Sequence, residues 1–474
     1  MTACTDHRAP DSPAITLQNQ SVTPVLAKLL PGASGGRLSA DGVKLYSLIS
    51  SDDKLTQSPN FVFGGSADGT GIFQNPDGNY SILVNHEDNF AVSRITLDKS
   101  FKPVKGEYIL NSDGGVWRLC SATLTTPLEH GFGPVFLTSG ESGQESRTHA
   151  LKVDADPQQA GISREVAGLG RWSAENAVPL PKTAYPGKTA ILIGDDDSDV
   201  NGGQLALYLS NTVGDLDNGS LYMLKLPDGN QRERDMQVGT SYSVEFAKIE
   251  NHKTLTGAQI NAQVNQLKAM KFGRVEDVDY RKGSAEAGRE VIFAVTGQAT
   301  TGANADYSRS KYGRIYKLTM DANDPLKGKL EVLLDGDNRN GPAKTFQDPD
   351  NVCVTKDYIY IMEDPNGYGD ETHDGYVYQY NLNSKQLTPI LELDHRRTAP
   401  DAAKYNVGGL SKFGDWESSG MIDVSDVTGR PNTFLLGIQA HTWRGTQYQG
   451  VDGGSIRRNE NQASQLILIE GLPR

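Results

Sequence analysis

The sequence predicts an all-β fold, a β-propeller of five or six blades with loop and short helical insertions. Three observations lead to this prediction. Short β-rich runs recur along the chain, and the 51 glycines among 474 residues indicate many tight turns. In addition, a loosely repeated unit consists of a β-rich run that ends in acidic or polar residues, a loop, and a second β-rich run. Units of three or four strands over roughly 50 to 80 residues fit propeller blades that carry insertions.

The repeated units read as antiparallel strand pairs. Their sequences are SILVNHEDN with AVSRITLD, PVFLTSGES with THALKVD, AILIGDDDSD with GGQLALYLSN, VIFAVTGQ with YGRIYKLTM, and YIYIMEDPNGYGDETH with DGYVYQYNL. The first strand of a propeller blade lines the central channel. We therefore take the first run of each pair as that strand and expect the polar residues after it to converge at one mouth.

One segment departs from the β pattern. Residues 256 to 272 predict a helix, with Thr256 as N-cap and with Ile260, Val264, Leu267 and Met270 near helical spacing. Composition does not otherwise change along the chain. We therefore expect a flexible N-terminal tether at residues 1–25 and a single propeller domain at residues 26–474.

Charge and hydropathy limit the partners. The net charge of −13 opposes binding to nucleic acid or an anionic membrane surface. No run of residues approaches the ~18 consecutive apolar positions of a spanning helix, so we expect no transmembrane segment. Separately, we expect the protein to be a monomer. Cys4 follows small residues and precedes a polar tether. It is either the lipid-accepting position of an exported protein or an incidental cysteine in a disordered N-terminus.

Acidic residues gather at strand ends and in a few other short motifs. The strand-end groups are Asn85, His86, Glu87 and Asp88; Glu141; Asp195, Asp196, Asp197 and Asp199; and Glu363 with Asp364. The other motifs hold Glu175; Glu276 and Asp277; Asp348, Asp350 and Asn351; and Glu417. So many carboxylates at one mouth would repel one another unless cations lay between them, and oxygen ligands at this density favour calcium. The simpler interpretation of any single group is an acidic turn that satisfies its own backbone.

Two of the three cysteines lie within the β-rich part of the chain. Cys353 is expected as a small apolar core residue. Cys120, in GGVWRLCSATL, is a candidate soft ligand for a transition metal, a buried structural cysteine, or a nucleophile that uses one of the eight histidines as base. The histidines considered for that base are His86, His130, His373 and His441. P-loop and H-E-x-x-H motifs are absent from the sequence.

The residues within these short motifs, and the order of the motifs along the chain, resemble those of a known family. LVNHE, LCSAT followed by LTSGE, LGRWSAE, GDD, FGRVED, DPDN, ESSG and IQAH occur in the order seen in PhoX-type alkaline phosphatases, over roughly residues 45 to 445. The chain resembles that family of exported propellers. The resemblance implies calcium and iron ions at the channel mouth, a thiolate on the iron, and hydrolysis of phosphomonoesters in the periplasm, at the cell surface or outside the cell.

Carried over motif by motif, the resemblance implies a set of metal ligands, namely Glu87, Cys120, Glu141, Glu175, Asp195, Glu276, Asp350 and Glu417. Arg171 and Arg274 stand next to these ligands in the sequence and are our candidates for forked contacts to the phosphoryl group. Either arginine could instead hold neighbouring carboxylates in position. The chain departs from the family at Ala174, where a histidine is usual, at Ser139 and Gly140, which replace Cys-Glu, and at Ala122 and Thr123, which replace glycines.

Two other functional classes remain open from the residues. A calcium-dependent lactonase or esterase would polarise a carbonyl with the same cations and would not need Cys120. A non-catalytic propeller would use calcium only to hold its blades together.

Overall fold

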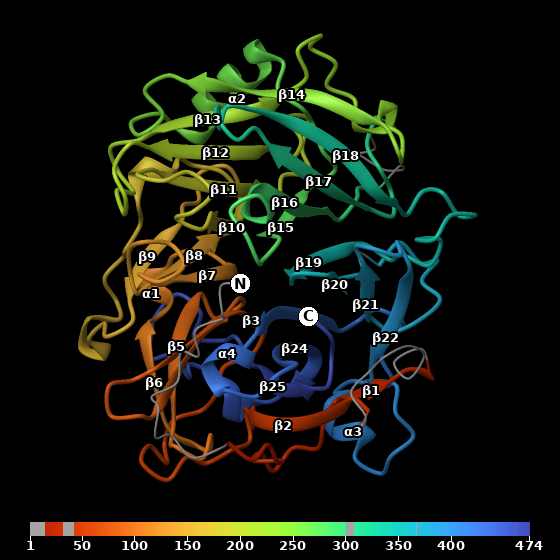
Figure 1. The fold of residues 1–474 in the computed structure, drawn as a ribbon. Helices are drawn as coiled ribbons and strands as arrows, with labels where there is room; N and C mark the ends of the chain where they lie inside the picture. Colours follow the sequence, from red (N-terminus) through yellow and green to blue (C-terminus); the bar gives the residue numbers. More distant parts are fainter. Residues whose placement is uncertain (1–14, 32–41, 300–307, 366) are drawn as a thin grey trace.

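The computed structural model describes residues 15–31, 42–299, 308–365 and 367–474. Within these ranges the strands form five antiparallel sheets, of which the largest has nine strands. That sheet contains two blades whose outermost strands, β14 and β18, pair edge to edge. Division at this pair gives six blades arranged in a ring (Figure 1). The predicted propeller fold is confirmed.

Blades 1 to 3 cover the first half of the ring. Blade 1 holds β3 (Ala67–Gln74), β4 (Tyr80–His86), β5 (Ala91–Leu97) and β6 (Pro103–Leu110); blade 2 holds β7 (Leu119–Thr125), β8 (Val135–Gly140) and β9 (His149–Lys152); blade 3 holds β10 (Ala174–Pro179), β11 (Thr189–Asp195), β12 (Leu205–Ser210), β13 (Ser220–Lys225) and β14 (Ser241–Ile249).

Blades 4 to 6 complete the ring. Blade 4 holds β15 (Val275–Tyr280), β16 (Glu290–Val295), β17 (Arg314–Met320) and β18 (Lys327–Asp335); blade 5 holds β19 (Pro349–Val354), β20 (Tyr358–Glu363), β21 (Tyr376–Asn381), β22 (Leu387–Leu393) and the N-terminal β1 (Ala27–Leu29); blade 6 holds β23 (Glu417–Asp423), β24 (Thr433–Arg444), β25 (Gln462–Glu470) and the N-terminal β2 (Lys44–Ser50).

The innermost strand of each blade contacts the innermost strand of the next. In ring order these strands are β3, β7, β10, β15, β19 and β23, and β23 returns to β3. The strand β2 closes the ring because it pairs with β25 along its length, so the two ends of the described chain share blade 6. The outer edge strands that remain are β1, β2, β6 and β9, and a propeller keeps such edges short.

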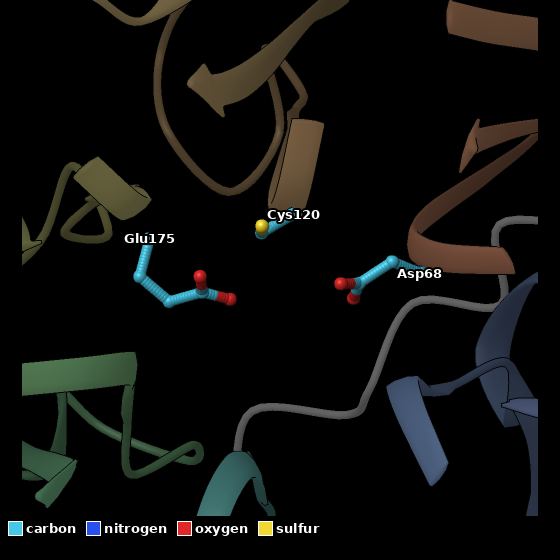
Figure 2. Close-up of side chains that lie close together, drawn as sticks. All are labelled: Asp68, Cys120 and Glu175. Carbon is cyan, nitrogen blue, oxygen red and sulfur yellow. The ribbon is translucent and has the colours of Figure 1, made fainter. Parts of the chain in front are cut away.

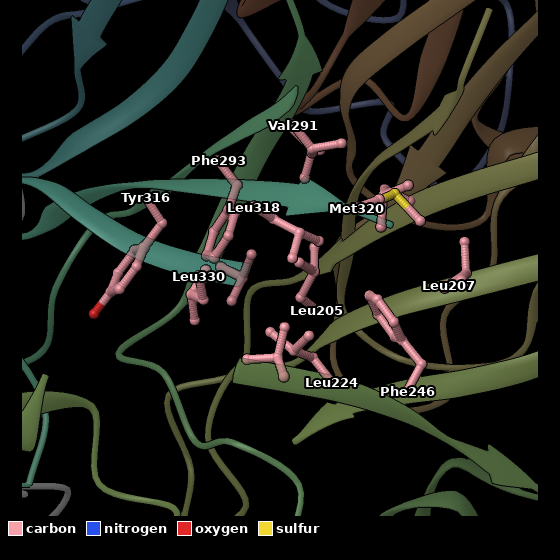
Figure 3. Close-up of a cluster of buried hydrophobic side chains, with 14 of the residues drawn as sticks. Leu205, Leu207, Leu224, Phe246, Val291, Phe293, Tyr316, Leu318, Met320 and Leu330 are labelled. Carbon is pink, nitrogen blue, oxygen red and sulfur yellow. The ribbon is translucent and has the colours of Figure 1, made fainter. Parts of the chain in front are cut away.

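Burial follows position within a blade. The second strands β4 and β11 are buried at every residue, whereas the outer strands β14 and β18 alternate between buried and accessible side chains. Strands covered on both faces need continuous apolar runs, while strands with one accessible face need apolar side chains on the other face only. The apolar core between blades 3 and 4 is the largest of these layers and includes Leu205, Phe246, Phe293 and Tyr316 (Figure 3).

The repeated units are antiparallel pairs, as expected, but they occupy a different place in each blade. SILVNHEDN and AVSRITLD form β4 and β5, the second and third strands, and the other four units likewise form second and third strands. The prediction that the first run of each pair lines the centre was therefore wrong. The innermost strands contain glycine, polar and charged residues, as in β3 (ADGTGIFQ). Because their apolar content is low, they are hard to recognise as strands in the sequence.

The helical segments are short. The predicted helix is α2 (Gly257–Leu267), with Thr256 as N-cap; Met270 lies beyond its end. Three one-turn helices, α1 (Ser112–Gly115), α3 (Ala402–Tyr405) and α4 (Ser425–Thr428), lie in connections. Short 3₁₀ turns occur at Pro157–Gln159, Ala167–Leu169, Glu233–Asp235, Ala287–Arg289 and Thr446–Tyr448. None of the helices in the described ranges combines the length and apolar character that crossing a membrane requires.

The expected N-terminal tether is only partly described. Cys4 lies outside the described residues. Residues 15–25, which we had assigned to the tether, pack on the propeller: Ile15 and Leu17 are buried, and Arg430 donates a hydrogen bond to the carbonyl of Ile15. Gln465 accepts from the amide of Leu26 at 2.9 Å, which fixes the chain just before β1.

The packing between blades 3 and 4 predicts a large stability effect at Phe293. Its ring is fully buried and stacks on Tyr316 with centroids 5.0 Å apart. We expect Phe293→Ala to lower the free energy of unfolding by about 3 to 5 kcal/mol in urea denaturation, because it removes apolar contacts and leaves a cavity. Lys317→Ala, on the next strand and in a partly exposed ion pair with Glu331, should cost less than about 1 kcal/mol. Equal losses for the two variants would contradict this packing.

Candidate metal centre

Each innermost strand places a ligand-type side chain at its beginning. Asp68, Cys120, Glu175, Glu276 and Asp350 are the second residues of β3, β7, β10, β15 and β19, and Glu417 is the first residue of β23. All six are buried. Since neighbouring innermost strands are in contact, six side chains from six blades meet at one end of the ring.

A local irregularity accompanies five of these positions. In β3, β7, β10, β15 and β19, antiparallel pairing to the second strand skips two residues, and the first of the two is the ligand-type residue. In β7, for example, Leu119 pairs with Gly140 and the next pair is Ala122 with Thr138. Such bulges bend the strand and redirect a side chain, and they are common beside functional sites. In β23 the skipped residues instead follow Ser419.

The ends of the second strands supply two further carboxylates. Glu87 directly follows β4, whose last residue His86 pairs with Ala67, and Glu141 directly follows β8. An antiparallel second strand runs back to the point where the innermost strand begins. Residues just after it therefore join residues at the start of the innermost strand.

We call these eight residues the acidic cluster: Asp68, Glu87, Cys120, Glu141, Glu175, Glu276, Asp350 and Glu417. They form four overlapping groups of three, and in each group one potential ligand atom per residue lies within 4.8 Å of the other two. The groups are Asp68, Cys120 and Glu175; Glu87, Cys120 and Glu141; Asp68, Glu87 and Glu417; and Glu175, Glu276 and Asp350. Figure 2 shows the first group, whose three side chains point toward a common space.

Burial and mutual repulsion raise the carboxyl pKa values throughout the cluster. Burial is the largest cause for Glu87, whose pKa rises to about 7, and Asp88 adds to the shift. The pKa values of Asp68, Glu175 and Glu417 lie well above their usual range, first because of burial and then because of neighbouring carboxylates. Unless a positive charge is added, the ionised forms are unfavourable at neutral pH.

The Cys120 thiol lies within this field of negative charge. Its Sγ is 3.3 Å from a carboxylate oxygen of Glu141. Burial and then Glu175, Glu87 and Glu141 raise the pKa of the thiol well above its usual range. A cysteine nucleophile needs a lowered pKa and a nearby base. The raised pKa does not favour a free nucleophile, and the position of the sulfur among carboxylates fits a ligand that loses its proton to a bound metal.

Three of the four histidines considered as bases have partners outside the cluster; His130 Nδ1, for one, accepts a hydrogen bond from the amide of Thr126 at 3.0 Å. His86 Nε2 lies 2.8 Å from Ser93 Oγ, and burial lowers the pKa of His86 to about 4. His373 Nε2 lies 2.9 Å from Glu363. His441 is near the cluster, with Nε2 3.6 Å from Glu417.

Two arginines border the cluster. Arg274 makes a forked contact with Asp196, at 2.5 and 3.0 Å, and its Nη2 lies 3.0 Å from Glu276. Arg118 lies 3.2 Å from Glu87 and is partly exposed. Two guanidinium groups cannot balance the seven carboxyl groups of the cluster, so an excess of negative charge remains when these groups are ionised.

The residues at this end of the ring fit bound cations. Asp68 is 2% exposed, and its Oδ1 has no hydrogen-bond partner; the same holds for Oδ1 of Asp195, which is 3% exposed. A buried carboxylate oxygen without a donor is costly unless it coordinates an ion. Oxygen ligands suit calcium, and the added sulfur of Cys120 suits a transition metal.

The structure brings together seven of the eight ligands expected from the sequence. The exception is Asp195, which lies at the end of β11 opposite Ala174 and belongs to none of the four groups. Of the two expected arginines, Arg274 borders the cluster, whereas Arg171 lies 3.3 Å from Glu145, which accepts a hydrogen bond from the first amide of α2.

Sequence reasoning missed Asp68. It stands alone in SADGTGIF, with no neighbouring acid to mark it. The residue two positions before Asp68 is Ser66, which has a left-handed backbone (φ +45°). The residues two positions before Glu276 and Asp350 share this feature: Arg274 has φ +71° and Asp348 has φ +65°. That shared left-handed turn before the strand is a backbone feature and is not visible in residue types.

Comparison with known proteins places the chain among phosphatases. The sequence profile of the family described as Alkaline phosphatase PhoX matches residues 128–407. Among solved structures, Pseudomonas fluorescens PhoX in complex with vanadate, a transition state analogue, is similar at a TM-score of 0.61 with 14% identity, over 97% of each chain. The α-L-arabinofuranosidase Arb93A from Fusarium graminearum reaches a TM-score of 0.41 at 11% identity, over 89% of this chain and 97% of that one. No curated protein sequence matches the chain.

The raised pKa of Glu87 predicts the pH dependence of the cation-free protein. Folding raises this pKa from 4.5 to about 7, so the folded state binds more protons than the unfolded state between these values. Stability of protein kept in chelator should therefore fall as pH rises from about 5 to about 8, by about 1.4 kcal/mol per unit of pKa shift. Urea denaturation of wild type and Glu87→Gln would measure this, and the variant should show a shallower fall. A wild-type stability that rises over this range would contradict the burial of the cluster as carboxylic acids.

Proposed function

The chain belongs to the alkaline phosphatase PhoX family, and from that premise we propose that it hydrolyses phosphate monoesters with metal ions held by the acidic cluster at the mouth of the central channel. One observation carries the proposal. Each of six blades delivers one buried carboxylate or thiol to the same place, and no packing requirement explains that coincidence. Uncompensated, this arrangement would destabilise the fold, so its retention favours a role in binding cations.

The donor set supports two kinds of ion. The groups that share Cys120 combine sulfur with carboxylate oxygen, whereas the two remaining groups offer oxygen alone. We propose that the Cys120 groups hold iron and that the oxygen-only groups hold calcium, following the softness of the donors. When bound, such cations neutralise phosphate oxygens, polarise phosphorus and lower the pKa of a coordinated water.

Arg274 is the side chain that we propose to orient the phosphoryl group. Its guanidinium is fixed by Asp196 and Glu276 and remains 20% exposed beside the cluster. A guanidinium offers five donors in a planar fork, so it can keep its carboxylate partners and still donate to a phosphate oxygen. The backbone of Arg274 is left-handed (φ +71°), a conformation that costs a non-glycine residue about 1 to 2 kcal/mol. Strain of this kind is typical of functional positions.

Arg171 was an equal candidate from the sequence, and its contacts favour a supporting role. The guanidinium binds the side chain and carbonyl of Glu145, and Glu145 in turn accepts from Gly257 at the start of α2. We propose that Arg171 anchors this helix, and that any effect on catalysis passes through the segment that follows Glu141.

The setting of the reaction is also a proposal. As in the family that it resembles, we propose an exported enzyme that acts on small phosphate esters outside the cytoplasm, as a monomer with a single propeller domain from residue 26 to 474 and with Cys4 as an attachment point. The family match and the single ring of blades support this setting.

Substitution of Cys120 separates this proposal from the other two classes. We expect Cys120→Ala to lose iron and most hydrolysis of p-nitrophenyl phosphate while it keeps calcium, because only the sulfur-containing groups are broken. Elemental analysis and steady-state kinetics of the purified protein would measure both. Cys353→Ala, at the other buried cysteine, should keep both metals and the activity. Calcium without iron in the wild type would favour the lactonase or the structural alternative, and full hydrolysis of p-nitrophenyl phosphate by Cys120→Ala would refute the role proposed for the thiolate.

The two arginines give a second comparison. Arg274→Lys should lower kcat/KM on the order of 10²-fold, because lysine cannot keep the fork to Asp196 and also donate to the phosphoryl group. Arg171→Lys should change kcat little and should mainly lower the melting temperature. The reverse order of effects on kcat would assign the phosphoryl contact to Arg171.

A further inference from the structure

The second residue of each bulge forms a layer of its own beneath the acidic cluster. In β7, β10, β15 and β19 the two residues skipped by the pairing are Cys120 and Ser121, Glu175 and Asn176, Glu276 and Asp277, and Asp350 and Asn351. The first member of each pair belongs to the cluster. The second members, Ser121, Asn176, Asp277 and Asn351, are all polar and between 1% and 7% exposed.

These buried polar side chains bond from blade to blade. Asn176 of blade 3 donates through Nδ2 to Oδ1 of Asp277 in blade 4 at 2.5 Å. The other oxygen of Asp277 accepts from the backbone amide of Val352 in blade 5 at 3.1 Å. One carboxylate therefore joins three successive innermost strands.

Asn351 continues the connection from blade 5. Its Oδ1 accepts from the amide of Gly420 in blade 6 at 2.7 Å, and the carbonyl of Gly420 accepts from Thr70 Oγ1 of blade 1 at 2.6 Å. Gly420 has φ +58°, and a Cβ there would lie 2.2 Å from the carbonyl oxygen of Asp68, so glycine alone permits this approach. The side-chain nitrogen Nδ2 of Asn351 also donates to Oγ of Ser121 in blade 2 at 3.2 Å and to Oδ1 of its neighbour Asp350 at 2.8 Å.

Two contacts complete the circuit. A Cβ at Gly69 of β3 would lie 2.4 Å from the amide nitrogen of Ala122 in β7, so these backbones touch directly. Thr123 of β7 donates to Asn176 of β10 at 3.4 Å. The contacts thus run through all six innermost strands and return to the first.

We propose that this circuit is a positioning belt for the metal ligands, with Asp277 and Asn351 as its main positioning residues. The proposal rests on the metal binding argued above and goes beyond it, because neither residue belongs to the acidic cluster.

The physical reason is the repulsion within the cluster. Carboxylates that repel one another separate if their backbones can move, and the bulges release the local pairing that would otherwise hold them. A hydrogen-bonded side chain directly after Cys120, Glu175, Glu276 and Asp350 restores that restraint. Partners of this kind, one step removed from a metal, typically change its affinity 10- to 100-fold when removed.

The chain offers a matched pair of variants for a test. Asp277 and Asp279 lie on the same strand, β15, and each accepts a backbone amide of β19: Val352 at 3.1 Å for Asp277 and Val354 at 2.7 Å for Asp279. Asp279 lies two residues farther from the cluster and also pairs with Lys282. Asp277→Asn and Asp279→Asn therefore weaken equivalent contacts between blades 4 and 5 at different distances from the ligands.

The measurement is a calcium titration of chelator-treated full-length protein, followed by thermal unfolding. We expect the calcium concentration at half-maximal stabilisation to rise at least about 10-fold in Asp277→Asn and to stay within about 2-fold of wild type in Asp279→Asn. In a parallel assay at saturating metal, kcat should fall in Asp277→Asn alone. Equal calcium midpoints for the two variants, or a wild type that calcium does not stabilise, would overturn the proposal.

A second pair of variants covers the case in which Asp277→Asn does not fold. Asn351→Ala and Cys353→Ala each shorten a buried side chain of β19, and only the first removes a member of the belt. The calcium midpoint should shift in Asn351→Ala alone, and a shift in neither variant would overturn the proposal. Because calcium alone is the probe, the outcome is distinct from that of the phosphatase assay: a shifted midpoint in a protein without phosphatase activity would support the belt and refute the proposed function.

Discussion

The structure depends on one electrostatic constraint, the burial of seven carboxyl groups and a thiol within a few ångströms of one another. Ionised carboxylates this close together repel one another, and protonated carboxyl groups would be poor ligands for cations. The propeller holds the groups together because they are distributed over six blades, and the blades are locked by closure of the ring through β2 and β25. The fold thus resists a repulsion that no single hairpin could withstand, and the cations that we propose would offset the rest.

Antiparallel geometry explains how residues so distant in sequence meet. An innermost strand begins where the second strand of the same blade ends, so each blade brings two sequence positions to the same end of the ring. In blade 1 these positions carry Asp68 and Glu87; in blade 2 they carry Cys120 and Glu141. In blade 6 the second strand instead carries Gln439, which donates to Glu417 at 2.9 Å. The ligand count is therefore set by the number of blades and by the use of both positions.

The sequence predicted the fold class because apolar second strands are conspicuous. Glu87 and Glu141 directly follow such strands, whereas the rest of the cluster was expected from short motifs and from the family resemblance. The sequence did not predict which strand is innermost, since those strands are short, polar and interrupted by bulges. For the same reason Asp68, alone between alanine and glycine, was missed. Arg171 and Arg274 look alike in sequence, and only their contacts separate them. The belt around Asp277 depends on pairings between blades, which residue spacing does not encode.

The family match gives the reaction class, and the donor set gives the reason that this chain can carry it out. The central claim is that cations occupy the acidic cluster. Anomalous X-ray diffraction from crystals of the purified protein, recorded on both sides of the iron absorption edge, tests it most directly. The account predicts an iron peak in contact with Cys120 Sγ and calcium density among the oxygen-only groups. Crystals with no metal density between Cys120, Glu175 and Asp68 would contradict it.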